Sequence, residues 1–281
     1  MWPSSQRRVV AMPKGYEKMR DAIKEDLLKK GMSREKAVMS GLPLNQIIHG
    51  DCLEVMRQFP DKSIDMILCD LPYGTTACKW DTVIPFEPLW EQYKRIIKDG
   101  GAIVLTAREP FTSLLVTSNI KWYKHKWVWN KKQSGSFQNA KYMPLQIEED
   151  IIVFAKGKVN YYPQMRKGKM RKRGGAKEKS RVVGSGLQDG YENHSDLYYP
   201  TNIIELANPR KNKLHPTQKP TELFEYLIQT YTKEGELVLD NCIGSGTTAI
   251  AALNTGRFFI GIEKEEKYVE IARKRIAEHT Q

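Results

Sequence analysis

The sequence predicts an α/β protein whose core is a mostly parallel sheet between layers of helices. Short apolar runs typical of buried strands alternate with stretches in which apolar residues recur at helical spacing. Several strand candidates end directly on an acidic residue, and ligands bind beyond the carboxyl ends of the strands in open α/β sheets. The chain has 281 residues, 40% of them hydrophobic, which suffices for one large domain with an insertion.

The first half of the chain contains five predicted strands. Three are short apolar runs, one has the alternation of an edge or antiparallel strand, and the fifth is apolar again. Helices fill the gaps between them, with apolar residues three or four positions apart. The strands are expected at 47–49, 64–69, 102–105, 122–129 and 150–154, and the helices from 51, at 86–97 and at 111–118.

A turn of unusual composition follows the second strand. Its sequence is Asp70-Leu71-Pro72-Tyr73-Gly74, so a carboxylate is expected at the rim of the sheet. Pro72 fixes φ and stiffens the turn. An ordinary tight turn and a functional site are both consistent with these five residues alone.

The second half contains a strand, a glycine-rich turn, a helix and a further strand that ends in Glu263. Gly244, Gly246 and Ala249 fit a G-x-G-x-x-A pattern, which indicates the mononucleotide-binding half of a Rossmann-like sheet. An adenosine-containing ligand, either NAD or S-adenosylmethionine, suits this unit. Asp240 favours S-adenosylmethionine, because a carboxylate would repel a pyrophosphate and attract a cation. The alternative interpretation is that the glycines only allow close packing of strand and helix.

The positive charge of the chain is concentrated in one segment. Of the net charge of +12, residues 156–181 carry +10 and the other 255 residues only +2. Tyrosines and methionines are interleaved with these cations, a combination typical of a nucleic-acid groove. A membrane-surface patch is the minor alternative, because no amphipathic helical pattern accompanies the charges. The expected contact residues are Arg166, Lys167, Lys169, Arg171, Lys172 and Arg173.

Other sequence features suggest a cytoplasmic protein without a metal site. No apolar run approaches the length of a membrane span. The four cysteines show no C-x-x-C spacing, and free thiols favour a reducing compartment. His125 has no second ligand at metal spacing.

Four segments together resemble the DNA amino-methyltransferases of the β arrangement, in which the catalytic motif precedes the target-recognition region and the cofactor motif. Residues 70–73 resemble the D-P-P-Y tetrapeptide of that family, and 240–248 its D-P-F-x-G-S-G-T-T loop. Residues 215–220 are similar to an H-x-T-Q-K-P segment, and 50–52 to a G-D-C element. The resemblance covers residues 45–276 and implies a site-specific, adenine-type enzyme of bacterial or phage kind with the S-adenosylmethionine-dependent methyltransferase fold.

The resemblance also implies roles for individual residues. Tyr73 would stack on a base flipped out of the duplex, while Asp70 and the carbonyl of Leu71 would accept hydrogen bonds from its amino group. Glu263 would hold the ribose of the cofactor, Asp51 and the amide of Cys52 its adenine, and Lys219 its carboxylate. The other expected cofactor-binding residues are Asp240, Gly244, Ser245, Gly246 and Thr247.

Three departures from the family pattern stand out. Leu71 replaces the first proline, Asn241-Cys242 replaces Pro-Phe, and Glu148-Glu149-Asp150 stands where the family often has His-Glu. We expect Leu71 to make the catalytic turn less stiff and Cys242 to pack more loosely over the adenine.

Adenine is the expected target, because an aspartate-led tetrapeptide is usual for adenine and a serine-led one for the N4 position of cytosine. Cytosine-N4 methylation is the nearest alternative. A methyltransferase acting on RNA or on protein amides is also close in chemistry, because similar tetrapeptides serve those acceptors. An NAD-dependent oxidoreductase and a non-catalytic DNA-binding protein are alternatives of other classes. The expected partner is double-stranded DNA, and the resemblance adds a homodimer and a cognate restriction endonuclease.

The expected organisation has four parts. Residues 1–44 form a helical appendage, 45–156 the catalytic half, 157–214 a loop-rich target-recognition insertion, and 215–281 the cofactor-binding half.

Overall fold

The computed structural model describes residues 42–75, 81–134, 137–173, 193–208 and 218–280. The helices expected near the N-terminus, the cysteine at position 78 and residues 215–217 of the H-x-T-Q-K-P segment lie outside this part.

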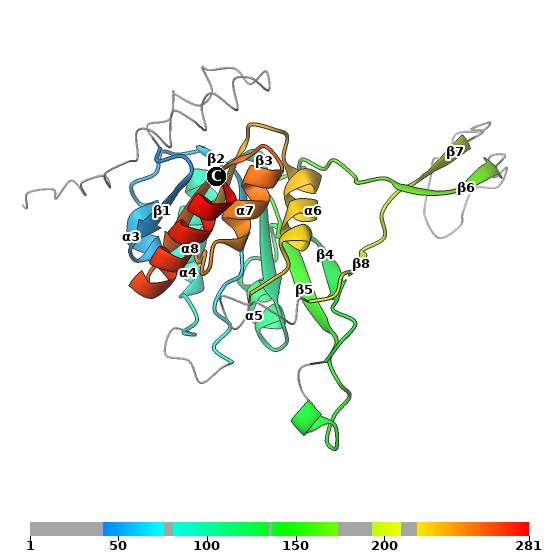
Figure 1. The fold of residues 1–281 in the computed structure, drawn as a ribbon, viewed down its shortest axis with the longest axis horizontal. Coiled ribbons are helices and arrows are strands. Elements are labelled where there is room, and N and C mark those ends of the chain that lie inside the picture. The colour runs from blue at the N-terminus through cyan, green and yellow to red at the C-terminus, as the bar shows by residue number, and fades with distance from the viewer. Residues whose placement is uncertain (1–41, 76–80, 135–136, 174–192, 209–217, 281) are drawn as a thin grey trace, which may run out of the picture.

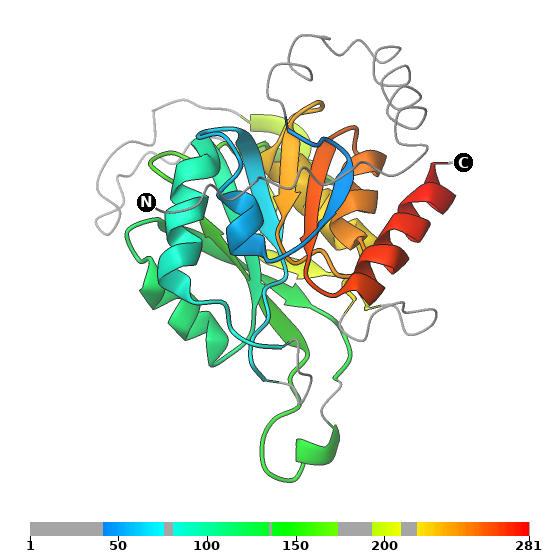
Figure 2. The same ribbon diagram turned by 90° about the vertical axis from the view of Figure 1, so that its left-hand side faces the viewer.

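An eight-stranded sheet runs through the molecule (Figures 1 and 2). Its order is β1-β10-β9-β2-β3-β5-β4-β8, and only β5 runs against its neighbours. The predicted mostly parallel sheet with an antiparallel strand is therefore confirmed. The strands of the sheet are β1 Gln46–His49, β2 Ile64–Cys69, β3 Ile97–Ala107, β4 Tyr123–Asn130, β5 Glu148–Phe154, β8 Ile203–Glu205, β9 Leu237–Asp240 and β10 Phe258–Glu263.

Helices cover both faces of the sheet, because the buried strands are apolar on both sides. In β2, Ile67 and Cys69 pack on the face covered by α3, α4 and α5, while Met66 and Leu68 pack on the face covered by α6, α7 and α8. Figure 2 shows the sheet between these two layers. The helices are α3 Cys52–Met56, α4 Phe86–Ile96, α5 Phe111–Ser118, α6 Thr221–Tyr231, α7 Thr247–Asn254 and α8 Glu266–His279, with a short 3₁₀ turn, η1, at Phe137–Asn139.

Two strands differ from the sequence-based expectation. β3 begins at Ile97 rather than 102, because Ile97 already pairs with Ile64 of β2 before the two glycines. β4 is antiparallel to β5, as predicted, but it is not an edge strand, since β8 pairs with its last residues.

The basic segment also contains more regular structure than its composition indicates. β6 Arg166–Arg173 and β7 Asn193–Tyr198 form a separate two-stranded antiparallel ribbon, which stands away from the sheet in Figure 1. β6 is rich in charge and neither strand shows apolar alternation, so the sequence pattern does not predict these strands. Only their cross-strand pairing identifies them.

No helix in the described ranges is both long and apolar enough to cross a membrane.

Candidate active site

Polar side chains gather at one edge of the sheet. The parallel strands all end at this edge, and the antiparallel strand β5 begins there. One cavity of about 720 Å³ opens at the same edge and is lined by both sequence motifs. The structure thus brings the Asp70 turn and the glycine-rich turn together across 170 residues of sequence. The polar strand-end residues that line the cavity are Asp51, Asp70, Lys131, Glu149, Asp240 and Glu263.

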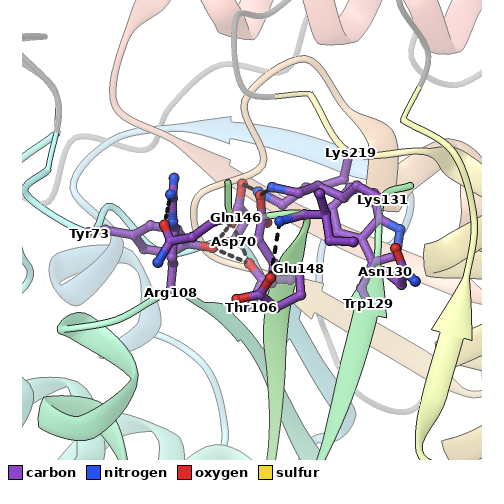
Figure 3. Close-up of polar contacts among 12 residues, drawn as sticks. Asp70, Tyr73, Thr106, Arg108, Trp129, Asn130, Lys131, Gln146, Glu148 and Lys219 are labelled. Carbon is purple, nitrogen blue, oxygen red and sulfur yellow. Dashed lines mark hydrogen bonds and ion pairs between the residues drawn. The ribbon is translucent and has the colours of Figure 1, made fainter. Parts of the chain in front are cut away.

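Asp70 follows the last residue of β2, and both of its carboxylate oxygens accept hydrogen bonds (Figure 3). Oδ2 accepts from Nζ of Lys219 at 2.7 Å. Oδ1 accepts from the hydroxyl of Tyr73 at 2.8 Å and from the hydroxyl of Thr106 on β3. The carboxylate is therefore fixed in orientation while its side chain remains 23% exposed to the cavity.

Lys219 is a buried cation held between two acids. Its Nζ lies 2.7 Å from Asp70 and 3.4 Å from Oε2 of Glu149, whose other oxygen pairs with Lys131 at 2.9 Å. Burial alone would lower the pKa of Lys219, but the two carboxylates outweigh it and the pKa is raised. The four side chains form an alternating chain of charges in which each acid has a cation.

Tyr73 packs inside the site rather than over its mouth. Its ring stacks on Phe111 of α5 with the centroids 5.1 Å apart, and Lys219 lies 5.7 Å from the ring centre on a cation–π contact. Burial, with Asp70 and Glu149 as nearby negative charges, raises the pKa of the phenol. The hydroxyl is therefore a neutral hydrogen-bond donor at physiological pH.

A buried acid holds the Asp70 turn in place of the missing proline. Asp81 accepts hydrogen bonds from the backbone N–H groups of Gly74 and Thr75, both at 2.9 Å. Gly74 has φ +69°, and a Cβ there would lie 2.9 Å from Val83. The side chain of Leu71 is only 3% exposed and packs in the core. The looser turn expected from Leu71 is thus compensated by Asp81 and by burial.

Asp240 shapes the glycine-rich turn. Its carboxylate accepts from the backbone N–H of Cys242 at 3.0 Å and from the hydroxyl of Thr248. It is 3% exposed, and its burial raises the pKa of the carboxyl to about 7. The turn then enters α7 through Gly246, whose φ of +85° and 3.2 Å approach of an added Cβ to Ala272 favour glycine.

Glu263 and Asp51 also bond to backbone beside the cavity. Glu263 accepts from the N–H of Gly244 at 2.8 Å and of Glu265 at 2.9 Å. Asp51 caps α3 by accepting from Leu53 at 3.0 Å. Each carboxylate oxygen has two lone pairs, so both acids keep capacity for donors on a ligand.

The Asn241-Cys242 departure is also accommodated by the surroundings. Asn241 is buried and its side-chain oxygen accepts from the hydroxyl of Tyr93 on α4 at 2.5 Å. Cys242 and Cys52 both line the cavity. The pKa of each thiol is raised, for Cys52 chiefly by a hydrogen bond with Cys242 and by burial, so neither is an activated nucleophile.

The predicted DNA-binding residues lie on the β6–β7 ribbon. Arg166, Lys167 and Lys169 are exposed, and Lys167 faces Asp196 at 4.0 Å. Arg171, Lys172 and Arg173 belong to β6, and Arg173 is the last described residue of that strand. The two remaining predicted cofactor contacts, Ser245 and Thr247, line the cavity beside Gly244.

Sequence reasoning missed three members of the site. Thr106, Lys131 and Glu149 all touch the Asp70–Lys219 pair or its neighbour. The available signal was their place near strand ends on the same edge as Asp70. Lys219, predicted to meet the carboxylate of the cofactor, lines the same cavity, and its ammonium donates to Asp70 and forms an ion pair with Glu149 at 3.4 Å. In the described residues, no three His, Cys, Asp or Glu side chains are grouped so as to hold a metal ion.

Comparison with known proteins agrees with this arrangement. A family profile described as DNA methylase matches residues 64–274, which include both turns. The chain belongs to the DNA methylase family. The methylase is 28% identical over 262 residues to the type II methyltransferase M.HinfI of Haemophilus influenzae, covering 84% of this chain and 69% of that protein. It is 29% identical over 252 residues to the DNA adenine methyltransferase YhdJ of Escherichia coli, covering 82% of each.

Solved structures share the fold of the methylase. The M1.HpyAVI–SAM complex has a TM-score of 0.57 at 24% identity, covering 82% of this chain and 98% of that one. The PvuII DNA methyltransferase, named as cytosine-N4-specific, has a TM-score of 0.60 at 16% identity, covering 86% and 95%. The observed sheet is therefore the fold of these methyltransferases, as the sequence predicted.

Proposed function

We propose that this methylase transfers the methyl group of S-adenosylmethionine to the exocyclic N6 amino group of an adenine flipped out of double-stranded DNA. The observation that carries the proposal is the cavity that joins Asp70 to the glycine-rich turn. A methyl acceptor and a methyl donor bound in one cavity can meet without a covalent enzyme intermediate.

The residues around the glycine-rich turn fit this cofactor. Glu263 and Asp51 supply acceptors for ribose hydroxyls and the adenine amino group, and the buried Asp240 suits a cation better than a pyrophosphate. The M1.HpyAVI–SAM complex, which shares the fold, supports the same assignment by analogy. When bound, the cofactor supplies a methyl group on a positively charged sulfur.

Asp70 would prepare the amino nitrogen for attack. The lone pair of an aromatic amino group is delocalised into the ring, so the nitrogen is a weak nucleophile. Hydrogen bonds from that amino group to Asp70 and to the carbonyl of Leu71 would hold the nitrogen closer to tetrahedral geometry and aim its lone pair. The nitrogen would bond to the methyl carbon as the carbon–sulfur bond of the cofactor breaks with its electron pair left on sulfur, and the nitrogen would then release one proton to water.

Lys219 would serve this step as a positioning residue. Its ion pair with Oδ2 of Asp70, at 2.7 Å, would hold the carboxylate in one orientation. Oδ1 already accepts from Tyr73 and Thr106, so the base would displace one of these donors. The base would take the place of the Tyr73 hydroxyl on Oδ1, and the freed Tyr73 ring would then stack on it. The cofactor-carboxylate role predicted for Lys219 is less well supported, because both of its neighbours are protein carboxylates.

Adenine is proposed over cytosine on two grounds. The tetrapeptide starts with Asp70, and YhdJ is named as an adenine methyltransferase. The PvuII enzyme keeps cytosine-N4 methylation as the second candidate. Incubating unmethylated duplex DNA with the protein and S-adenosylmethionine, followed by nucleoside mass spectrometry, should yield N6-methyladenine. N4-methylcytosine alone would reverse the choice of base, and labelled methyl groups only on RNA or protein would reject DNA as the substrate.

The β6–β7 ribbon is proposed as part of a target-recognition insertion spanning residues 157–214, between a catalytic half at 45–156 and a cofactor-binding half at 215–281. Neutralising Arg166, Lys167 and Lys169 with glutamine should weaken DNA binding and lower the salt slope of the association constant by up to about 3. The slope comes from a titration of fluorescent duplex at several salt concentrations. A slope equal to that of the wild type would remove the ribbon from the interface.

Two further partners belong to this proposal. The resemblance to amino-methyltransferases supports a homodimer, which sedimentation can test. The name of M.HinfI, a type II methyltransferase, supports a companion restriction endonuclease, and DNA modified by this methylase should then resist that nuclease.

A further inference from the structure

The loop between β4 and β5, residues 131–147, exposes a cluster of apolar side chains that the proposed function leaves unused. Tyr142 is 88% exposed, the highest value for a large hydrophobic side chain in the described part of the chain, and Phe137 is 68% exposed. Met143, Leu145 and Ile147 are 46%, 41% and 38% exposed. Five exposed large apolar side chains within eleven residues of one loop indicate an interaction surface.

Both ends of the loop lie at the mouth of the active site. Lys131 and Gln146 line the cavity, and Lys131 pairs with Glu149 of the charge chain that reaches Asp70. Figure 2 shows the loop, with η1 at its tip, extending beyond the sheet edge where the chain leaves β2. A base that enters the cavity beside Lys131 and Gln146 would pass next to this loop.

The charge of the loop favours an anionic partner. Residues 131–147 contain three lysines and no acid. Lys131 and Lys132 pair with Glu149 and Glu205, while Lys141 is exposed next to Tyr142, which suits a polyanion. A second copy of the chain is the competing occupant, but a two-fold interface would place this patch on itself and bring the lysines of both copies together. The combination of cations and exposed aromatic rings instead matches a surface for stacked or unpaired bases.

We propose that residues 137–147 of this loop insert into the duplex beside the flipped adenine, with Phe137 and Tyr142 stacking on the bases left behind. Apolar side chains that enter a base stack hold the duplex open, so the loop would offset the cost of extruding the base. This inference rests on the proposed function and adds a second DNA-contacting element to the β6–β7 ribbon.

The test compares two duplexes that differ in the cost of flipping. One carries the recognition site mapped for the wild type, and the other carries the same site with a mismatch opposite the target adenine, which makes extrusion easier. For the Phe137→Ala/Tyr142→Ala variant we expect kcat/KM on the matched duplex to fall by about tenfold or more. On the mismatched duplex the loss should be at most about threefold. The matched control is Ile120→Ala, a side chain 61% exposed before the start of β4, which should equal the wild type on both duplexes.

A second readout follows the base itself. With 2-aminopurine at the target position, the wild type should raise the fluorescence on binding, and the double variant should raise it less at saturating protein. Cofactor affinity by calorimetry should stay at the wild-type value, which shows that the variant is folded.

Three results would overturn the inference. An equal loss on both duplexes, or no loss on either, would show that the loop does not assist flipping. A change from dimer to monomer in sedimentation, with unchanged 2-aminopurine fluorescence, would make the loop an interface between copies. If the wild type methylates no DNA at all, the proposed function fails first, and the loop variants are not needed to show it.

Discussion

Asp70 directly follows strand β2, and Asp240 is the last residue of the neighbouring parallel strand β9. The surroundings of the two acids nevertheless differ. Asp70 is 23% exposed, borders the cavity and pairs with the ammonium of Lys219 at 2.7 Å. Asp240 is 3% exposed and bonds to the backbone of its own turn and to Thr248. A position at the end of a strand thus places an acid at the edge of the cavity, while the residues that other elements bring to it decide its role.

The energetic consequences of the two environments also differ. Lys219 reaches Asp70 from a segment 149 residues away and forms an ion pair with it at 2.7 Å. The hydrogen bonds of Asp240 come instead from neutral donors, so burial, and to a smaller extent the negative charge of Asp70, raises the pKa of its carboxyl to about 7. One acid is thus suited to holding an amino group, and the other to responding when a cationic ligand binds.

The largest expected effect is that of Asp70→Asn. The amide keeps the shape of the side chain but replaces one acceptor oxygen with a donor, so the transfer rate should fall at least about a hundredfold. Cofactor affinity, measured by calorimetry, should not change. Single-turnover transfer of labelled methyl groups gives the rate, and wild-type turnover in this variant would contradict the proposed mechanism.

The next largest effect is expected for Lys219→Met, because this variant leaves Asp70 and Glu149 without their shared cation. Removing one partner of a buried ion pair costs about 3 kcal/mol or more of the free energy of unfolding, which urea denaturation measures. The matched control is Lys62→Met, which breaks the Lys62–Asp99 pair of the same 2.7 Å length, with both side chains more than half exposed. Equal stability losses in the two variants would mean that the Lys219 pair behaves as a surface pair.

Asp240 should make cofactor binding depend on pH. The cofactor is cationic and favours the charged carboxylate, so its affinity should rise by up to about tenfold between pH 6 and 8. The effect of Asp240 on the stability of the folded protein changes with pH in the opposite direction. The carboxyl titrates near 3.8 when unfolded and near 7 when folded, so without cofactor its contribution to stability decreases as pH rises between these values. Asp240→Asn should flatten both profiles in calorimetry and thermal unfolding, and an unchanged pH profile in this variant would assign the titration to another group.

Much of the fold was predictable because strands buried on both sides are continuous apolar runs. The Ile64–Cys69 run, its acid and the G-x-G turn were recognisable, since strong local patterns coincide there with tertiary demands. The β6–β7 ribbon was not predicted as strands, because β6 is mostly charged, β7 is mostly polar, and only cross-strand pairing defines the two strands.

The site was predictable only where motif residues are local. Asp70, Tyr73 and the glycines stand in short contiguous segments. The contacts of Lys219 with Asp70 and Glu149 were not predicted, because the sequence gives the neighbours of a residue along the chain but not across it. Thr106 and Glu149 belong to strands whose order in the sheet cannot be read from the sequence, so their approach to Asp70 and Lys219 required the structure.

A pair of matched variants tests most directly whether Asp70 serves methyl transfer and Asp240 serves cofactor binding. Thr106 donates its hydroxyl hydrogen to Asp70, and Thr248 donates to Asp240, so valine at either position removes that hydrogen bond with little change of shape. At position 106 it also removes the acceptor of a hydrogen bond from Tyr73 at 2.9 Å. Each variant is assayed for cofactor affinity and for single-turnover transfer at saturating cofactor. We predict that Thr106→Val slows transfer by about fivefold with wild-type cofactor affinity, and that Thr248→Val weakens cofactor binding by about fivefold with wild-type transfer. The reverse pattern, or the same defect in both variants, would contradict the assignment of chemistry to Asp70 and of cofactor binding to Asp240.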